Sequence, residues 1–476
     1  MCYLFLSRAT LPINELKRTT AKGGCADLNL HLCIPYIYGM KSHTFENGFR
    51  VIHEKSFHGS NAASIQVICD IGSIHESPDS RGSAHFIEHM CFKGTASHPT
   101  SFEISTMIDK TGSYINAFTS KRYTKYMIDT NTDSVLDYIK LIADMLLNST
   151  FDKGEYTKER EVVREEMIQD ADDAENAVLQ NADTAIFAGS LYEYPVDDLI
   201  FHSGKNALAF DKIVEMYRTF YIPSRMILSV CSANSFATIC ETVSKSFFVN
   251  KRDPIVACPK TLVLSLAPQT DVVYKITKAP INPIHICIGF RACSIYDSDR
   301  YILKLLNRIL SGSLSTRLFM ILREENGLTY SSYTDGEYFE NAGSFIFYAE
   351  CDATKIFVNG PTAGVFPLIL KLIHDLVKDG ITKTELDIAK SSYKGKLLLS
   401  KENADSIASY NAKNMLFNID NAPAYVNKYS ANIQPITVAD INTCIRKYFR
   451  RENMVVSVIG RSPPSQKMLE KYVDTK

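Results

Sequence analysis

Apolar residues follow two different periods along this chain, and together the two periods predict a mixed α+β fold. Residues 64–71 and 226–230 are short apolar runs rich in β-branched side chains, which is typical of buried strands. Residues 135–148 instead place apolar positions on one side of an amphipathic helix, and residues 210–220 are also expected to be helical. Asn47-Gly48 indicates a tight hairpin across residues 44–52.

Residues 83–94 carry the strongest chemical signal. We predict a helix that ends at Gly94, because a lysine in the last turn followed by glycine is a stop signal. His85 and His89 are four residues apart and share one helix face, with Glu88 beside them. A single helical histidine is usually only packed or solvated, but two imidazoles at this spacing can share one divalent ion, most often zinc. The pattern is the inverse of His-Glu-x-x-His and favours a metal site.

A second helix is predicted over residues 152–188, which are dense in Glu and Arg. A charge run of this kind normally forms a solvated helix face. Glu159 and Glu166, however, are seven residues apart and lie on one face. Two nitrogen ligands leave a vacancy that a carboxylate commonly fills, and spacing alone does not say which Glu fills it.

Two distant stretches of the chain echo each other. Tyr221 and residues 226–230 match Phe449 and residues 454–458, in each case 228 positions later. The echo predicts two α+β halves of like fold. The second half lacks the histidine motif, since its matching helix near 303–310 contains no His. Further strands are expected at 113–119, 123–130, 284–290 and 344–350, and further helices at 101–111, 235–247, 300–310, 316–325, 366–379, 384–399 and 439–449.

Composition places the chain among globular, multidomain proteins. Its 476 residues exceed one ordinary core, and a net charge of -1 gives no basic field for nucleic acid. No apolar run is long enough to span a membrane. The 12 cysteines form no Cys-x-x-Cys pair, and Cys69, Cys231 and Cys287 are expected to be buried hydrophobes. This usage indicates a reducing intracellular compartment, with the cytoplasm favoured and the mitochondrion as the alternative.

The first 40 residues are interpreted as an N-terminal arm. A disordered or targeting segment is the alternative, because basic residues outnumber acidic ones there. Met40, just before the first clear domain signal, is a second candidate start.

The run AHFIEHM at 84–90, continued by FKGT at 92–95, resembles the signature of the pitrilysin/insulinase family of zinc metallopeptidases, the inverzincins. The resemblance extends over about residues 44–460 and is to the short-chain branch with mitochondrial processing peptidase and bacterial processing-peptidase-like proteases. It implies two homologous α/β-sandwich halves of one clamshell. The expected parts are an arm at 1–40, a catalytic zinc-binding domain at 41–250, a linker at 251–271 and a non-catalytic substrate-binding domain at 272–476.

The resemblance also assigns roles to particular residues. The run EREVVREEM at 159–167 is similar to the family segment that holds the third ligand. It implies that Glu166 joins His85 and His89 around one Zn²⁺ per chain and that Glu159 supports the site. Glu88 is then the general base that takes a proton from a zinc-activated water.

Three further segments are compared with the family. Residues 112–119 resemble an edge strand onto which substrate adds, which implies substrate contacts at Asn116 and Ala117; read alone, they form an ordinary strand. Residues 315–330 resemble the run with a substrate-contacting arginine and tyrosine, here Arg323 and Tyr330. Arg122 departs from the family, which often has an acid there, so the local substrate preference is expected to differ.

The hypothesis is therefore a zinc-dependent endopeptidase acting on short or unfolded polypeptides. A homodimer is expected, because one chain of two halves closes only half of the clamshell and Arg323 and Tyr330 share a chain with the metal motif. The alternative is a non-catalytic structural subunit of the same family, which zinc content would distinguish.

Overall fold

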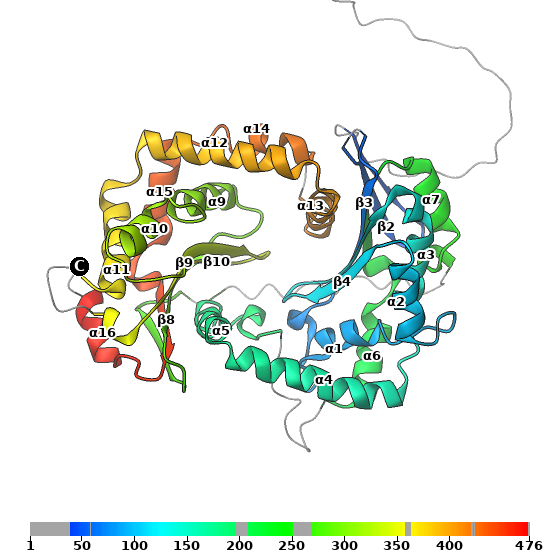
Figure 1. The fold of residues 1–476 in the computed structure, drawn as a ribbon, viewed down its shortest axis with the longest axis horizontal. Coiled ribbons are helices and arrows are strands. Elements are labelled where there is room, and N and C mark those ends of the chain that lie inside the picture. Colours follow the sequence, from blue (N-terminus) through cyan, green and yellow to red (C-terminus); the bar gives the residue numbers. More distant parts are fainter. Residues whose placement is uncertain are drawn as a thin grey trace, which may run out of the picture. The chain divides into compact units, whose positions relative to one another are not determined.

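The computed structural model describes residues 39–57, 59–196, 208–250, 266, 268–357, 363–419, 422 and 424–474. The arm at 1–38 and most of the linker, residues 251–265 and 267, lie outside the described residues. Described strands form two sheets, each accompanied by helices (Figure 1). The expected α+β class is confirmed.

The first sheet has six described strands in the order β1-β2-β6-β3-β5-β4. All neighbours are antiparallel except β2 and β6, which are parallel. The hairpin expected at Asn47-Gly48 connects β1 and β2, and Gly48 has a φ of +84°. The strands are β1 Met40–Thr44, β2 Arg50–Lys55, β3 Ala62–Cys69, β4 Tyr114–Thr119, β5 Thr124–Asn131 and β6 Met226–Ser232.

The second sheet has five described strands in the order β7-β11-β8-β10-β9, which repeats the order β2-β6-β3-β5-β4. Its one parallel pair, β7 with β11, stands where β2 pairs with β6. These strands are β7 Val273–Lys278, β8 Ile284–Ala292, β9 Ser332–Tyr338, β10 Gly343–Cys351 and β11 Met454–Gly460.

The 228-residue echo corresponds to the same strand position in both sheets. Val230 of β6 pairs with Ile65, and Val458 of β11 pairs with Ile286. The duplication predicted from a few matching residues therefore extends to strand order, direction and register.

Helices of the first half cover one face of the first sheet (Figure 1). Its core joins strand residues such as Val67 and Leu228 to Phe86, Ile142 and Ile213 of the helices. The helices are α1 Ser83–Met90, α2 Ser101–Asp109, α3 Val135–Leu147, α4 Lys153–Asp172, α5 Ala174–Ile186, α6 Phe210–Phe220, α7 Phe236–Ser244 and α8 Phe247–Asn250.

The second half repeats this plan, with α9 between β8 and β9 as α1 lies between β3 and β4. Its core includes Ile286, Phe290, Leu306, Ile369 and Ile445. The helices are α9 Asp299–Leu310, α10 Arg317–Phe319, α11 Val365–Asp379, α12 Lys383–Ser400, α13 Ala404–Leu416, α14 Lys428–Asn432, α15 Val438–Tyr448 and α16 Gln466–Val473, with a π-helix at Met320–Glu324.

Each half lends one helix to the other half's sheet. On the first sheet, Ile52, Ile68 and Ile227 point away from the main core and pack with Ala412 and Leu416 of α13. The Ser229 hydroxyl donates to the Ala408 carbonyl at 2.8 Å. On the second sheet, residues of α5 pack on the face that includes Cys287, Val455 and Ile459. Both sheets are thus buried on both faces, which explains the near-continuous apolar runs of their central strands.

Two predicted helices end differently from expectation. The helix predicted to reach Gly94 ends at Met90, and Gly94 instead has a φ of +132° in the following turn. The single helix predicted over 152–188 is two helices, α4 and α5. Asp173 separates them, because its backbone is extended and its carboxylate accepts from the Glu175 and Asn176 amides. That side chain caps the first turn of α5.

None of the helices in the described part of the chain is both long enough and apolar enough to cross a membrane.

Candidate metal centre

Buried side chains and a carboxylate at its N-terminus hold helix α1 in place. Phe86, Ile87 and Met90 are buried in the first core and fix its orientation. The Glu76 carboxylate, from the preceding loop, accepts from the Gly82 amide at 2.8 Å and from the Ala84 amide at 2.7 Å. These bonds satisfy amides at the helix start and complement its dipole. The opposite side of α1 therefore presents His85 and His89 in a fixed position.

His85, His89 and Glu166 come together although their helices are separated in sequence. The two imidazole Nε2 atoms lie 3.2 Å apart, and His89 Nε2 lies 3.4 Å from Glu166 Oε2. One ligand atom from each residue falls within a 4.8 Å group. Donors at about 2.05 Å from a tetrahedral zinc ion are themselves about 3.3 Å apart. The three side chains therefore have the chemistry and the spacing of a zinc ligand set.

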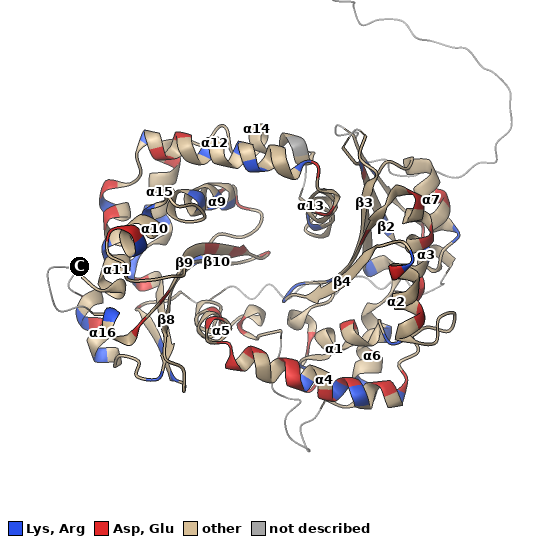
Figure 2. Cartoon of the chain, viewed as in Figure 1, with Lys and Arg blue, Asp and Glu red and all other residues tan. Residues whose placement is uncertain are grey.

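Glu159 lies on the same face of α4 but serves the other ring nitrogen. Its Oε1 lies 2.8 Å from His89 Nδ1, and its Oε2 pairs with Lys93. Only 4% of Glu159 is exposed, so it does not belong to the solvated charge run of α4 visible in Figure 2. A carboxylate at Nδ1 fixes the ring orientation and directs Nε2 toward Glu166.

Electrostatics at His89 reflect this double contact. Burial lowers the pKa of the imidazole, but the bonds with Glu159 and Glu166 outweigh burial and raise that pKa to about 9. Contact with His89 lowers the pKa of the Glu166 carboxyl, although burial opposes this shift. The metal-free group is thus a cationic ring held between two carboxylates.

Glu88 lies on α1 outside this donor group and has its own partner. Its Oε2 accepts a hydrogen bond of 2.6 Å from the Thr119 hydroxyl, at the end of β4. Burial raises the pKa of the Glu88 carboxyl, while Thr119 and the two histidines oppose the rise. Thr119 was not among the site residues predicted from the sequence. The sequence shows only that a hydroxyl residue ends the predicted edge strand. It does not show that this hydroxyl contacts Glu88.

Asn116 and Ala117 lie on β4, which ends the first sheet in the described residues. One side of β4 pairs with β5, where Ala117 is opposite Tyr126. The Ala117 amide donates to the Asn116 Oδ1 at 2.9 Å. The edge on which substrate was expected to add is therefore a terminal strand next to the base, and a neighbouring side chain occupies one of its amides.

Arg323 and Tyr330 form a separate pair in the second half. Arg323 Nη1 donates to the Tyr330 carbonyl at 3.2 Å, and its guanidinium lies 5.8 Å from the Tyr330 ring. Arg323 is part of the π-helix, a distortion common at functional sites. Tyr330 is 86% exposed and is available to another molecule. In the described residues, the side-chain hydrogen bonds and ring contacts of this pair are with each other and with Phe319.

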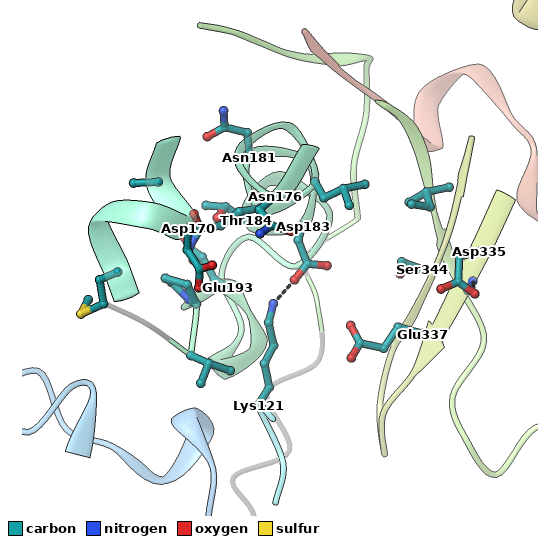
Figure 3. A pocket seen from close by; sticks show the side chains of 18 residues that line it. Lys121, Asp170, Asn176, Asn181, Asp183, Thr184, Glu193, Asp335, Glu337 and Ser344 are labelled. Atoms are coloured by element: carbon teal, nitrogen blue, oxygen red, sulfur yellow. Dashed lines mark hydrogen bonds and ion pairs between the residues drawn. The ribbon is translucent and has the colours of Figure 1, made fainter. Parts of the chain in front are cut away.

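A cavity of about 830 Å³ lies beside α4, the helix that contains Glu166, and is shown in Figure 3. Met167, which follows Glu166 on α4, lines it, and so do residues of α5 and β9. Its carboxylates are Asp170, Asp183, Glu193, Asp335 and Glu337, and its cation is Lys121. Burial, followed by the charge of Asp183, raises the pKa of Glu337 to about 7.

Lys121 and Arg122 are neighbours in the chain but have different surroundings. Lys121 pairs with Asp183 and donates to the Tyr192 carbonyl at 2.7 Å, inside the cavity wall (Figure 3). Arg122 is only 6% exposed and pairs with both Asp70 and Glu340. Acids of both halves therefore neutralise its charge, and Arg122 is not among the residues that line the cavity.

Comparison with known families covers most of the chain. Residues 50–196 match the family described as Insulinase (Peptidase family M16), and residues 207–393 match the Peptidase M16 inactive domain.

This chain is similar to named proteins of bacteria and to a mitochondrial-processing peptidase subunit. An uncharacterized zinc protease of Bacillus subtilis is 32% identical over 386 residues, which span 79% of this chain and 88% of that protein. The mitochondrial-processing peptidase subunit beta of Dictyostelium discoideum is 24% identical over 88% of each chain.

Solved structures share the fold at lower identity. A protease from Helicobacter pylori superposes with a TM-score of 0.80 at 20% identity, over 89% of this chain and all of that one. A peptidase M16 inactive domain from Pseudomonas fluorescens gives a TM-score of 0.77 at 16% identity, over 89% and 98% of the two chains. Two family matches in succession, and a close relative along most of the chain, show that this protein belongs to the insulinase family of zinc proteases, peptidase family M16.

Proposed function

We propose that this protein is a zinc-dependent endopeptidase that cleaves short or unfolded polypeptides. The proposal rests on the donor group formed by three side chains. Its distances are 3.2 Å between the Nε2 atoms of His85 and His89 and 3.4 Å between His89 Nε2 and Glu166 Oε2. Family membership supports it, because the relatives are named zinc proteases.

His85, His89 and Glu166 hold the ion in this proposal, one ion per chain. When bound, zinc supplies a Lewis acid that polarises the scissile carbonyl and acidifies water. Glu159 keeps the His89 ring oriented, and Lys93 in turn holds Glu159. A fixed ring presents its Nε2 lone pair without a further cost in side-chain entropy.

Glu88 is the proposed general base. Its carboxylate is near the donor group but is held by Thr119, so it accepts a proton from the attacking water and returns it to the leaving amine. Burial favours the proton-carrying form after transfer, since it raises the pKa of this carboxyl.

Substrate binds, in this proposal, as an extra strand on the free side of β4. Backbone pairing gives affinity that depends little on sequence, and the Asn116 side chain gives up the Ala117 amide to the peptide. Arg323 and Tyr330 of the second half position the peptide backbone. We also propose that two copies of the chain form a homodimer.

Replacing Glu88 with Gln tests the base directly. We expect peptide cleavage to fall by roughly 10²–10⁴-fold, because the amide accepts no proton, while the protein keeps about one zinc ion per chain. The measurement is turnover of a quenched fluorescent peptide together with zinc content. Cleavage at the wild-type rate would contradict the mechanism, and wild-type protein without zinc or activity would favour the non-catalytic alternative.

Replacing Thr119 with Val tests how the base is held. We expect kcat to fall about tenfold, because a hydrogen bond to a charged group contributes roughly 1.5–3 kcal/mol. KM and zinc content should change little, and Thr119→Ser should restore most of kcat. An unchanged kcat in Thr119→Val, or no rescue by serine, would show that the hydroxyl does not position Glu88.

Zinc uptake should depend on pH in a defined direction. The His89 ring has a pKa of about 9 in the metal-free protein, so it is protonated below that pH and must lose its proton to bind through Nε2. We therefore expect the apparent zinc Kd to fall about tenfold per pH unit between pH 7 and 9, then level off.

Competition with a zinc-sensitive indicator at several pH values measures this dependence. Glu166→Gln should weaken zinc binding, while Glu161→Gln, an exposed position of the same helix, should not. A Kd that is constant between pH 7 and 9 would contradict the role given to His89.

A further inference from the structure

Five cations gather in the second half, on α9 and on the helices that follow α12. Arg300, Lys304 and Arg308 lie on α9, Lys413 lies on α13, and Lys428 begins α14. We call this group the α9 basic cluster. None of the five pairs with a carboxylate in the described part of the chain. Neighbouring lysines on other faces do pair, for example Lys371 with Asp375 and Lys383 with Asp387.

The spacing on α9 makes the cluster costly without a counter-charge. Residues 300, 304 and 308 are four apart, so their side chains follow one another along a single helix face. Like charges at this spacing repel and destabilise a helix. Lys304 is exposed, but the protein packed around it and the charges of Arg300 and Lys413 lower its pKa to about 8. Burial and the charges of Lys304 and Arg308 lower the pKa of Lys428 to about 8 as well.

Tyrosine rings surround these cations instead of acids. The Lys428 ammonium lies 3.6 Å from the Tyr425 ring centroid, and the Arg308 guanidinium lies 5.4 Å from that of Tyr393. Lys304 lies 5.8 Å from the Tyr338 ring. Aromatic faces stabilise a cation without neutralising it, so the net positive charge remains for a ligand.

The α9 basic cluster adjoins the cavity that lies beside α4. Asp335 and Glu337 line that cavity, and their charges act on Lys304 and on Lys413 respectively. Met167, which follows Glu166 in the sequence, also lines this cavity. A peptide held at the donor group and passing through the cavity would therefore meet the cluster with residues that lie away from the scissile bond.

The size of the cluster decides the kind of anion. Residues 300 to 308 span about 12 Å of helix, which corresponds to about four residues of extended peptide. A row of this length suits several separate carboxylates better than one compact phosphate. Resting on the proposed peptidase function, we propose that the α9 basic cluster binds acidic side chains of the substrate, so that the enzyme prefers peptides with an acidic segment remote from the cut.

Binding of matched peptides to zinc-loaded Glu88→Gln protein tests this inference. Two pairs of peptides share one neutral core. Within each pair, three flanking residues are all Glu in one peptide and all Gln in the other. The flank precedes the core in the first pair and follows it in the second. For one placement we expect the Glu peptide to bind about tenfold more tightly at low salt, with the preference shrinking as salt screens the charges. Fluorescence anisotropy gives both affinities.

The ratio of the two affinities should fall to about one when Lys304→Gln and Lys428→Gln are combined, and to an intermediate value with Lys304→Gln alone. The control pair Lys371→Gln and Lys383→Gln should keep the full ratio. Equal binding of the Glu and Gln peptides in both placements, or a ratio that survives loss of both cluster lysines, would overturn the inference. Because the ratio is internal to each variant, a general loss of stability does not imitate the result.

Cleavage of the Gln peptides by wild-type protein separates the two proposals. Cleavage without a charge preference would overturn only the role of the cluster. A charge preference in binding without cleavage of any peptide would overturn the peptidase proposal and support the cluster.

Discussion

The contact between α1 and α4 through His89 is the interaction on which the candidate site depends. Each nitrogen of that ring faces a different carboxylate of α4, Glu159 at Nδ1 and Glu166 at Nε2. The two acids are seven residues apart, so one helix face supplies both. Because Phe86 and Ile87 anchor α1 in the core, the ring has little freedom to leave this position. These contacts orient the His89 ring, and they leave Glu88, the proposed base, outside the donor group.

The duplicated fold explains how such a small site is kept rigid. Each sheet is buried on both faces, once by its own helices and once by a helix from the other half. The ion pair of Arg122 with Glu340 adds a further buried link between the halves, and Asp70 of the first half also pairs with Arg122. The equivalent of α1 in the second half, α9, contains no histidine, and one of its faces carries Arg300, Lys304 and Arg308 of the α9 basic cluster instead.

Much of the fold could be predicted because it depends on local patterns. The strands β6 and β11 and the helix α6 follow from apolar periodicity, and the two sheets follow from the 228-residue echo. The break at Asp173 was missed because one capping side chain, not a change in periodicity, separates α4 from α5. The strand β9 was missed because Ser332–Tyr338 is largely polar and is recognised only by its pairing with β10.

The residues of the candidate site could also be proposed from local sequence patterns. His85, Glu88 and His89 are adjacent in sequence, and helical spacing places Glu159 and Glu166 on one face. Thr119 and the packing of α13 on the first sheet are long-range contacts, which no local pattern encodes.

Anomalous scattering at the zinc edge from crystals of the zinc-loaded protein tests the central claim most directly. We expect one strong peak per chain, about 2.0–2.2 Å from His85 Nε2, His89 Nε2 and a Glu166 oxygen, with Glu88 outside bonding distance. A peak elsewhere, or one coordinated by Glu88 in place of Glu166, would contradict it.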